Sequence, residues 1–416
     1  MGTINTTSTL TGLFKESYGD SVISLVPSDA PLCKMVDMEV RQLLGNKYHQ
    51  PVDVTLEHGF TCAAANAGAV TLLPVSNGVM QDAQFEGAQL IGRSQVDYES
   101  IARSAGGGQK AFLSATKQVV KRLARSGAKR LEAQFLHGRR GIGILSAVSG
   151  SSTTRTWTIT DESWAAGIWA GSVGATLDVL EPADYTTKIN TNAAVTITSV
   201  NIANKQVLVS GNATDLTAIA AADILFFETG SATTEMAGLD TWTRNTGTLF
   251  NVAGGTYEMW QGNVYSTSTG VISIGKILEA VGQTASYGGN KPVVAIMSPR
   301  AFEVLNSDQA ALRQYDVSYS STGKNGFRTL KYAGQTGEIT ILPHYLQKDG
   351  LCHIFCPEEA LRVGAQDLSF IKRHGTEEAL ILENSTTSGA EMRVYSNQCL
   401  VVEQPRHCVV MAGITF

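Results

Sequence analysis

The densest group of residues able to do chemistry is a run of cations between positions 103 and 140. This stretch holds ten Lys or Arg residues and a single acid, Glu132. Lys117, Lys121 and Arg125 recur every four positions, so on a helix they share one face, where like charges repel. Such a face can screen phosphates without reading a base sequence. The candidate DNA-facing cations are Lys117, Lys121, Arg122, Arg125, Lys129 and Arg130.

The same cations have a plainer interpretation. They can form a solvated helix face, or pair with acids of the N-terminal region and of neighbouring chains. Taken by themselves, the residues favour this interpretation over contact with nucleic acid.

Other spacings that could carry chemistry are incomplete. Cys352 and Cys356 have a C-x₃-C spacing, but they lie on a predicted strand without a second matching pair, so buried cysteines are predicted and not metal ligands. Residues 106–110 and 138–143 are rich in Gly, yet neither has the spacing and the Ser or Thr of a Walker loop. The sequence contains no G-x-S-x-G or H-E-x-x-H motif. It therefore predicts no catalytic, metal or cofactor site.

The composition limits the class of protein. The chain has 416 residues, 43% of them hydrophobic and 17% charged, which allows roughly two to three domains. The net charge of −5 excludes a globally basic nucleic-acid binder but allows a local basic patch. Residues 1–12 lack the features of a secretory signal, and the longest apolar runs are too short to span a bilayer. Six sparse cysteines predict free thiols in a reducing compartment.

The basic run lies on the clearest predicted element, a helix over 107–137. Gly138 is predicted to end it as a C-terminal cap. About thirty residues at 1.5 Å each give a rod of roughly 45 Å. Before it, positions 41–105 predict an extended hairpin with a long polar loop, in which Gly87 forms a bulge in the returning strand over 83–90. An isolated hairpin is marginal in water, so this segment is predicted to lean on a neighbouring subunit.

After the helix, short β-rich stretches over 154–230 predict a small β-barrel or sandwich. A helix is then predicted over 269–286, and another begins at Pro299 after the capping residue Ser298. Further strands are predicted over 292–297, 327–332, 338–342, 351–355, 391–403 and 406–411.

This α+β order of elements resembles the Hong Kong 97-type fold of tailed-bacteriophage major capsid proteins. Lys129 to Gly138 is similar to the end of the spine helix in one capsid subfamily. Gly238-Leu239-Asp240, Trp260 and the helix from Thr269 are similar to its re-entry into the body. The resemblance divides the chain into an N-terminal arm (1–40), an E-loop hairpin (41–105), the spine helix and start of the P-domain (106–153), an inserted β-rich domain (154–230), connecting loops (231–268), the A-domain with part of the P-domain (269–390) and C-terminal P-domain strands (391–416).

The resemblance implies a structural protein, not an enzyme. It would self-assemble as hexamers and pentamers into the icosahedral head around double-stranded DNA, which it would bind non-specifically. Implied partners are the chain itself and a portal, with scaffold and decoration proteins as further candidates, and neither a cofactor nor a membrane. The protein would assemble in the bacterial cytoplasm and reside in the virion. Isopeptide cross-linking is not carried over, because Lys47 is the only lysine between Asn46 and Ser100.

Two alternatives remain open at this point. One is an encapsulin-like nanocompartment shell of the same fold, which would hold cargo protein in place of DNA. The other is a β-rich surface or adhesin protein, suggested by the Thr-rich insert.

Overall fold

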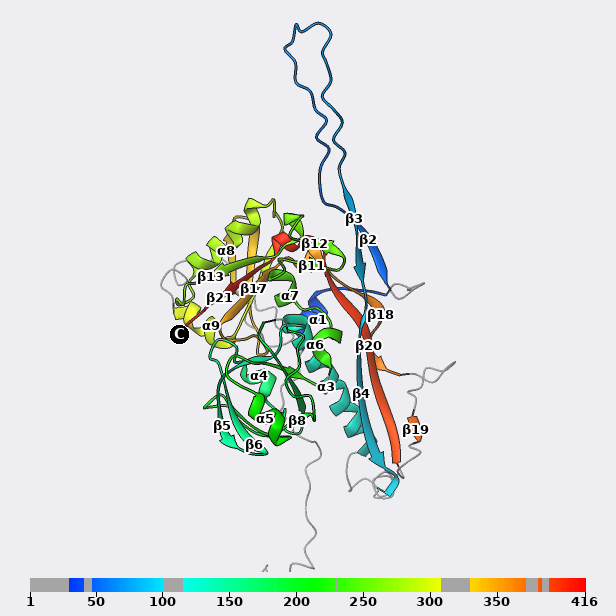
Figure 1. Cartoon of the computed structure of the whole chain (residues 1–416), viewed down its shortest axis with the longest axis vertical. Helices are drawn as coiled ribbons and strands as arrows, with labels where there is room; N and C mark the ends of the chain where they lie inside the picture. Colours follow the sequence, from blue (N-terminus) through cyan, green and yellow to red (C-terminus); the bar gives the residue numbers. More distant parts are fainter. Residues whose placement is uncertain are drawn as a thin grey trace, which may run out of the picture.

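The computed structural model describes residues 30–40, 47–99, 115–183, 185–228, 230–307, 330–371, 381–383 and 389–416. Its architecture is mixed α+β, as predicted, and it is built around an elongated sheet, a six-stranded sheet and a closed barrel (Figure 1). A two-stranded hairpin projects from this body. The apolar clusters expected in the N-terminal arm before residue 30, and the start of the predicted long helix, lie outside the described residues.

The elongated sheet forms one side of the molecule, and helix α3 (Ala115–His137) lies along it (Figure 1). The strand order is β1-β18-β20-β19, with β4 on the other side of β20. These strands are β1 (Met38–Val40), β18 (Ala360–Phe370), β20 (Gly389–Val402), β19 (Ile381–Glu383) and β4 (Ala88–Asp97). Leu123 of α3 packs against Val96, Met392 and Val394 of the sheet. The apolar face of the helix is thus covered, and its opposite face is left to charged residues.

The six-stranded sheet forms the core of the second layer. Its order is β13-β21-β17-β14-β16-β15. The strands are β13 (Asn263–Ser266), β21 (Val409–Ala412), β17 (Leu351–Phe355), β14 (Val293–Met297), β16 (Gly337–Pro343) and β15 (Leu330–Gly334). Helices α8 (Ile274–Ser286) and α9 (Pro299–Ser307) share a hydrophobic cluster with it. The predicted cap of α9 is confirmed, because Ser298 Oγ accepts the amide of Ala301 at 3.2 Å.

The β-rich segment closes into a six-stranded barrel, which was one of the two predicted forms. Its strands are β5 (Gly143–Ser151), β6 (Thr154–Ile159), β7 (Thr176–Leu180), β8 (Val195–Asn201), β9 (Gln206–Ser210) and β10 (Ile224–Phe227), with the short helices α4 (Ala166–Trp169) and α5 (Ala213–Ala218). The barrel uses β5, which precedes the insert boundary predicted at 154. Trp157 and Trp169 are fully buried in one cluster that also includes Leu136 of α3. The barrel core is therefore continuous with that of the body.

The predicted hairpin exists as β2 (Tyr48–Asp53) and β3 (Met80–Phe85), and residues 54–79 form a long loop at its far end (Figure 1). The expected bulge at Gly87 is wrong. The returning segment is two strands, because β3 ends at Phe85 and β4 joins the elongated sheet. Gly87 lies at this junction, where a Cβ would overlap the side-chain oxygen of Asn397.

Helix α3 ends at His137, as predicted, but Gly138 is not the left-handed residue. That conformation belongs to Arg139, with φ 63°. Gly138 is needed for another reason, because a Cβ there would overlap the carbonyl oxygen of Met236. The described part of the helix has 23 residues and is therefore about 35 Å long.

Short elements complete the fold. The helices are α1 (Pro31–Met35), α6 (Ser231–Thr234) and α7 (Leu239–Thr243), the 3₁₀ turns are Glu258–Trp260, Pro357–Glu359 and Pro405–His407, and the remaining hairpin is β11 (Thr248–Leu249) with β12 (Val252–Ala253). The last two predicted strands exist as β20 and β21, but they join different sheets. Among the described helices, none is both long and apolar enough to cross a membrane.

Candidate assembly surfaces and the basic helix

The loop over 54–79 exposes apolar side chains far from the body. Its two arms are joined near the base by hydrogen bonds, among them Val54 N to Val79 O at 3.0 Å and His58 N to Ser76 O at 3.0 Å. Leu56, Leu72 and Val75 are 77%, 78% and 81% exposed. Several large apolar side chains exposed on one loop make it a candidate site of protein contact.

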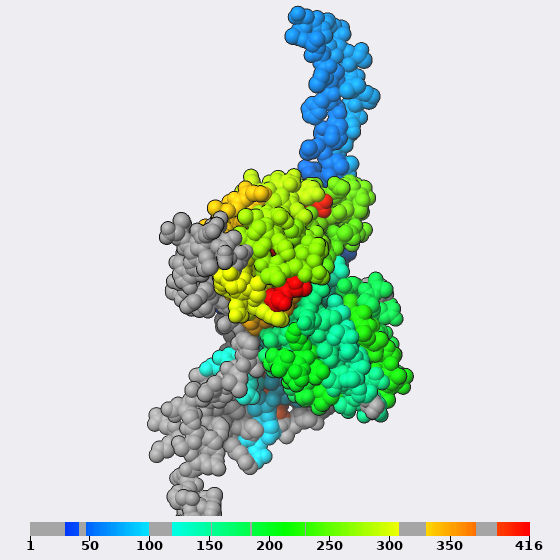
Figure 2. Space-filling view, turned by 90° about the vertical axis from the view of Figure 1, so that its left-hand side faces the viewer, coloured from blue at the N-terminus to red at the C-terminus, as the bar shows by residue number. Residues whose placement is uncertain are grey.

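In the space-filling view the loop stands clear of every other part of the molecule (Figure 2). A hairpin of two strands is at best marginally stable in water when nothing covers it. The side chains of Phe60, Leu72 and Leu73 gain burial only if another surface covers them. The loop is therefore the first candidate assembly surface.

The basic residues of α3 divide into two groups. Lys121, Arg122 and Arg125 are exposed and stand on the described helix. Lys117 lies one turn earlier on the same helix, and its side chain is outside the described residues. The three described side chains form an exposed cationic face on the helix.

Lys129 and Arg130 instead contact the barrel. Lys129 Nζ donates to the carbonyl of Ala170 at 2.5 Å, and burial lowers the pKa of Lys129 to about 8. The guanidinium of Arg130 lies 3.5 Å from the ring centre of Phe227, and its Nε lies 3.3 Å from a carboxylate oxygen of Glu228. These two cations join the helix to the barrel.

Glu132, the single acid of the basic run, is fully buried. Its carboxylate accepts the backbone amides of Leu32 at 2.7 Å and Cys33 at 3.1 Å. Nε2 of His344 lies 3.1 Å from the same group. Leu32 and Cys33 belong to the short helix α1, which begins at Pro31. Because Pro31 has no backbone N–H, Glu132 satisfies the next two amide donors in the first turn of α1. The segment before the elongated sheet is thereby fixed to α3.

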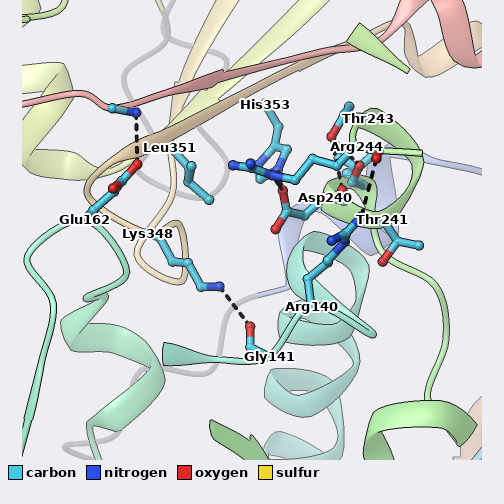
Figure 3. Close-up of polar contacts among 12 residues, drawn as sticks. Arg140, Gly141, Glu162, Asp240, Thr241, Thr243, Arg244, Lys348, Leu351 and His353 are labelled. Carbon is cyan, nitrogen blue, oxygen red and sulfur yellow. Dashed lines mark hydrogen bonds and ion pairs between the residues drawn. The ribbon is translucent and has the colours of Figure 1, made fainter. Parts of the chain in front are cut away.

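Charged residues also fill the junction between barrel and body (Figure 3). Asp240 of α7 accepts from Arg244 Nε at 2.7 Å and lies 3.5 Å from His353 Nε2. Burial by itself would raise the pKa of Asp240, but the hydrogen bond from His353 and the charge of Arg244 hold it well below its usual value. Lys348 is 3% exposed and donates to the carbonyl of Gly141 at 2.8 Å.

The other sequence motifs do not form a reactive site in the described part of the chain. Cys352 and Cys356 are buried, and burial raises the pKa of both thiols, that of Cys352 to about 12. The described residues contain no group of three or more His, Cys, Asp or Glu that could hold a metal ion. The Gly-rich residues 106–110 lie outside the described residues, and 138–143 connect α3 to β5.

Comparison with known proteins is informative at the level of structure. No family model and no curated protein matches the sequence. The capsid asymmetric unit of cyanophage A-1(L) matches with a TM-score of 0.58 and 11% identity, over 99% of this chain and 100% of that chain. The capsids of the native and empty GTA particles match with TM-scores of 0.54 and 0.52, each at 9% identity over 99% of this chain and 100% of that chain. The fold is that of a capsid protein.

Within this capsid fold, the sequence-predicted cations lie on one helix but have two kinds of surroundings. Lys121, Arg122 and Arg125 face outward, whereas Lys129 and Arg130 are engaged by the barrel. Sequence reasoning did not assign a role to the anchoring carboxylate or to the buried junction. The position of Glu132 as a lone acid among cations was a usable signal. The residues at the junction between barrel and body, such as Asp240 and Lys348, are far apart in the sequence, so no sequence pattern indicated that they meet.

Proposed function

We propose that this chain is a major capsid protein that self-assembles as hexamers and pentamers into the icosahedral head of a tailed bacteriophage, around double-stranded DNA. The observation that carries the proposal is the likeness to capsid structures over the whole length of both chains. The role is structural, and the protein would reside in the virion. Portal, scaffold and decoration proteins would be its further partners.

In this proposal the elements take the names of the Hong Kong 97-type fold. The hairpin and loop over 47–86 serve as the E-loop, which is shorter than the predicted 41–105 because β4 pairs with β20. Helix α3 serves as the spine helix and the elongated sheet as the P-domain. The six-stranded sheet serves as the A-domain, and the barrel is the inserted domain. The exposed apolar side chains of the E-loop support this assignment, because contact with a neighbouring subunit would bury them.

The exposed cations of α3 would face the packaged DNA. Lys121, Arg122 and Arg125 would screen the DNA phosphates, and this screening does not depend on the base sequence of the DNA. Lys117, one turn away, would extend the same face. Lys129 and Arg130 are assigned to holding the barrel, which narrows the DNA-facing group predicted from the sequence.

The assembly is tested by expressing the chain and examining particles by electron microscopy and light scattering. The loop variant carries Leu72→Ser and Leu73→Ser, and the matched control carries Val173→Ser on the barrel, where the side chain is 62% exposed. We expect shells from the wild type and the control, and folded but unassembled chain from the loop variant. Normal shells from the loop variant would refute the role of the loop.

The contents of the shell are tested separately. We expect DNA in particles isolated after infection, and expect Lys121→Gln with Arg122→Gln and Arg125→Gln to lower the salt dependence of DNA binding by up to about three phosphate contacts. A control triple variant carries Lys34→Gln, Arg93→Gln and Arg300→Gln, which are exposed cations elsewhere. Particles filled with a cargo protein and free of nucleic acid would instead indicate a nanocompartment.

A further inference from the structure

The base of the hairpin is held by a two-residue turn of the body. Phe250 and Asn251 connect β11 to β12, and both have positive φ, 51° and 70°. The amide of Gln84 in β3 donates to the carbonyl of Phe250 at 2.9 Å. Nδ2 of Asn251 donates to the carbonyl of Asp82 at 3.1 Å. The turn therefore binds the backbone of β3 at two alternate residues.

The turn has an unusual residue at its first position. Two consecutive left-handed residues define a type I′ turn, where Asn, Asp and Gly are preferred, and a bulky residue there is strained. The ring of Phe250 lies 4.8 Å from that of Phe85 in β3 and 5.1 Å from that of Trp242 in α7. Aromatic pairs at such separations are attractive, and this contact offsets the strain. Phe250 thus joins the buried end of β3 to the core of the body.

One more hydrogen bond, from Gln81 Nε2 to the hydroxyl of Tyr257 at 3.3 Å, ties β3 to the body. Beyond it the loop over 54–79 extends freely, as both views show (Figures 1 and 2). Half of the loop, about thirteen residues, reaches roughly 40 Å when extended. A rotation of about 10° at its base would then move the tip by roughly 7 Å. A small rotation at the base of the hairpin therefore causes a large displacement of the loop tip, which is the part that would meet another subunit.

We propose that the Phe250–Asn251 turn is a clamp that fixes the angle at which the loop leaves the body, and so sets the angle between adjacent subunits and the diameter of the shell. The proposal rests on the proposed function, in which the loop contacts a neighbour. The two residues of the clamp do not contact the neighbouring subunit themselves. They hold β3 in place, and the loop makes the contact with the neighbour. Its effect on the loop angle is a property of the single chain and is measurable without a shell.

The chain offers a natural probe for this angle. Cys62 is exposed on the loop, and the other five cysteines are buried. A nitroxide spin label on Cys62 and a second label on Val173→Cys of the barrel report the loop-to-body distance by double electron–electron resonance. Labelled chain is diluted with unlabelled chain so that distances within one chain dominate.

Two variants separate the side-chain bond from the backbone conformation. Asn251→Gly removes the bond to Asp82 but tolerates the left-handed turn, and Asn251→Ala removes the bond and also strains the turn. The control is Ser268→Ala, an exposed left-handed residue after β13 with φ 53°. Asn251 is itself exposed, so all three variants should fold.

We expect a narrow distance distribution in the wild type and control, a broader one in Asn251→Gly and the broadest in Asn251→Ala. Shell diameters measured by electron microscopy should spread in the same order. An unchanged distance distribution in Asn251→Ala overturns the clamp, and broadened distances with a single unchanged diameter overturn its control of shell size. If the wild type forms no shell either when expressed alone or in infected cells, the proposed function is refuted, and distances that still differ among the variants would support only the control of the loop angle by the turn.

Discussion

The carboxylate of Glu132 accepts a hydrogen bond from the backbone amide of Leu32 at 2.7 Å, across 100 positions of the chain. The contact takes place in the interior, where both residues are fully buried. It converts the one acid of a cationic helix into the anchor of the segment that leads into β1. The one acid among the cations therefore has a structural role, which is to hold the two amides of α1.

Replacing Glu132 by Ala should destabilise the protein strongly. The change leaves the amides of Leu32 and Cys33 without their acceptor in the interior, so we expect a loss of about 3 kcal/mol in the free energy of unfolding. Urea denaturation followed by circular dichroism measures it. Glu132→Gln keeps one acceptor oxygen and should lose less. Equal stability of Glu132→Ala and wild type would show that the anchor is dispensable.

Trp169 should be a major contributor to the stability of the barrel. It is fully buried, and its ring stacks on that of Trp164 at 6.1 Å. Trp169→Ala should cost about 3–5 kcal/mol, because it leaves a large cavity. Thermal or urea unfolding provides the measurement. The exposed Val173→Ala is the control and should stay within about 0.5 kcal/mol of wild type. A small effect at Trp169 would mean that the barrel core collapses around the cavity.

The buried Lys348 should give the protein a stability that rises with pH in the alkaline range. Burial lowers the pKa of Lys348 from 10.5 to about 8. Because the pKa in the folded state is the lower one, the folded protein bears a penalty that is complete below about pH 8 and disappears as the pH rises toward the unfolded value. The contribution of Lys348 to the free energy of unfolding should therefore increase by about 2 kcal/mol between pH 8 and 10.

Unfolding curves of wild type and Lys348→Met at pH 7, 8, 9 and 10 test this prediction. The free energy of unfolding of the wild type should rise relative to that of the variant between pH 8 and 10. The two proteins share every other titrating group, among them Lys129, whose pKa burial lowers to about 8, and the buried cysteines, whose raised thiol pKa values act in the opposite direction. If the free energy of unfolding of the two proteins changed equally with pH, Lys348 would not be a source of the pH dependence.

Arg130 and Arg122 should respond differently to the same substitution. The guanidinium of Arg130 stacks on Phe227 and pairs with Glu228, whereas Arg122 is exposed. A lysine cannot reproduce the planar stack, so Arg130→Lys should lower stability by about 1 kcal/mol and Arg122→Lys should be neutral. Chemical denaturation compares the two variants. Equal effects would contradict the assignment of Arg130 to the barrel contact.

The sequence predicted those strands and helices whose formation depends on residues close together in the chain. The apolar run Leu351–Phe355 became a strand with the predicted bounds, and the alternating residues Gln206–Ser210 form a strand inside the predicted β-rich stretch. The pairing of Ser298 with Pro299 marked the start of α9, because a cap and a missing amide act within one turn.

Elements set by distant contacts were missed or misjudged. Strand β5 is rich in Gly and Ser and has little β-propensity, and it is a strand because β6 and β10 flank it. Gly87 was interpreted as a bulge because Asn397, which crowds it, lies far away in sequence. For the candidate site, the run of cations was visible, but the division between the exposed Arg125 and the engaged Arg130 depends on where the barrel docks.

The continuity of β3 with β4 has a mechanical consequence. A pull on the hairpin is transmitted directly into β4, whose residues Ala88 to Asp97 pair with β20 in ten consecutive positions. Hydrogen bonds in an antiparallel ladder run perpendicular to the strands. A tensile load along β4 therefore shears all ten positions together and cannot unzip them one by one. A neighbouring chain that pulls on the hairpin along β4 would thus load this sheet in the direction in which it resists most.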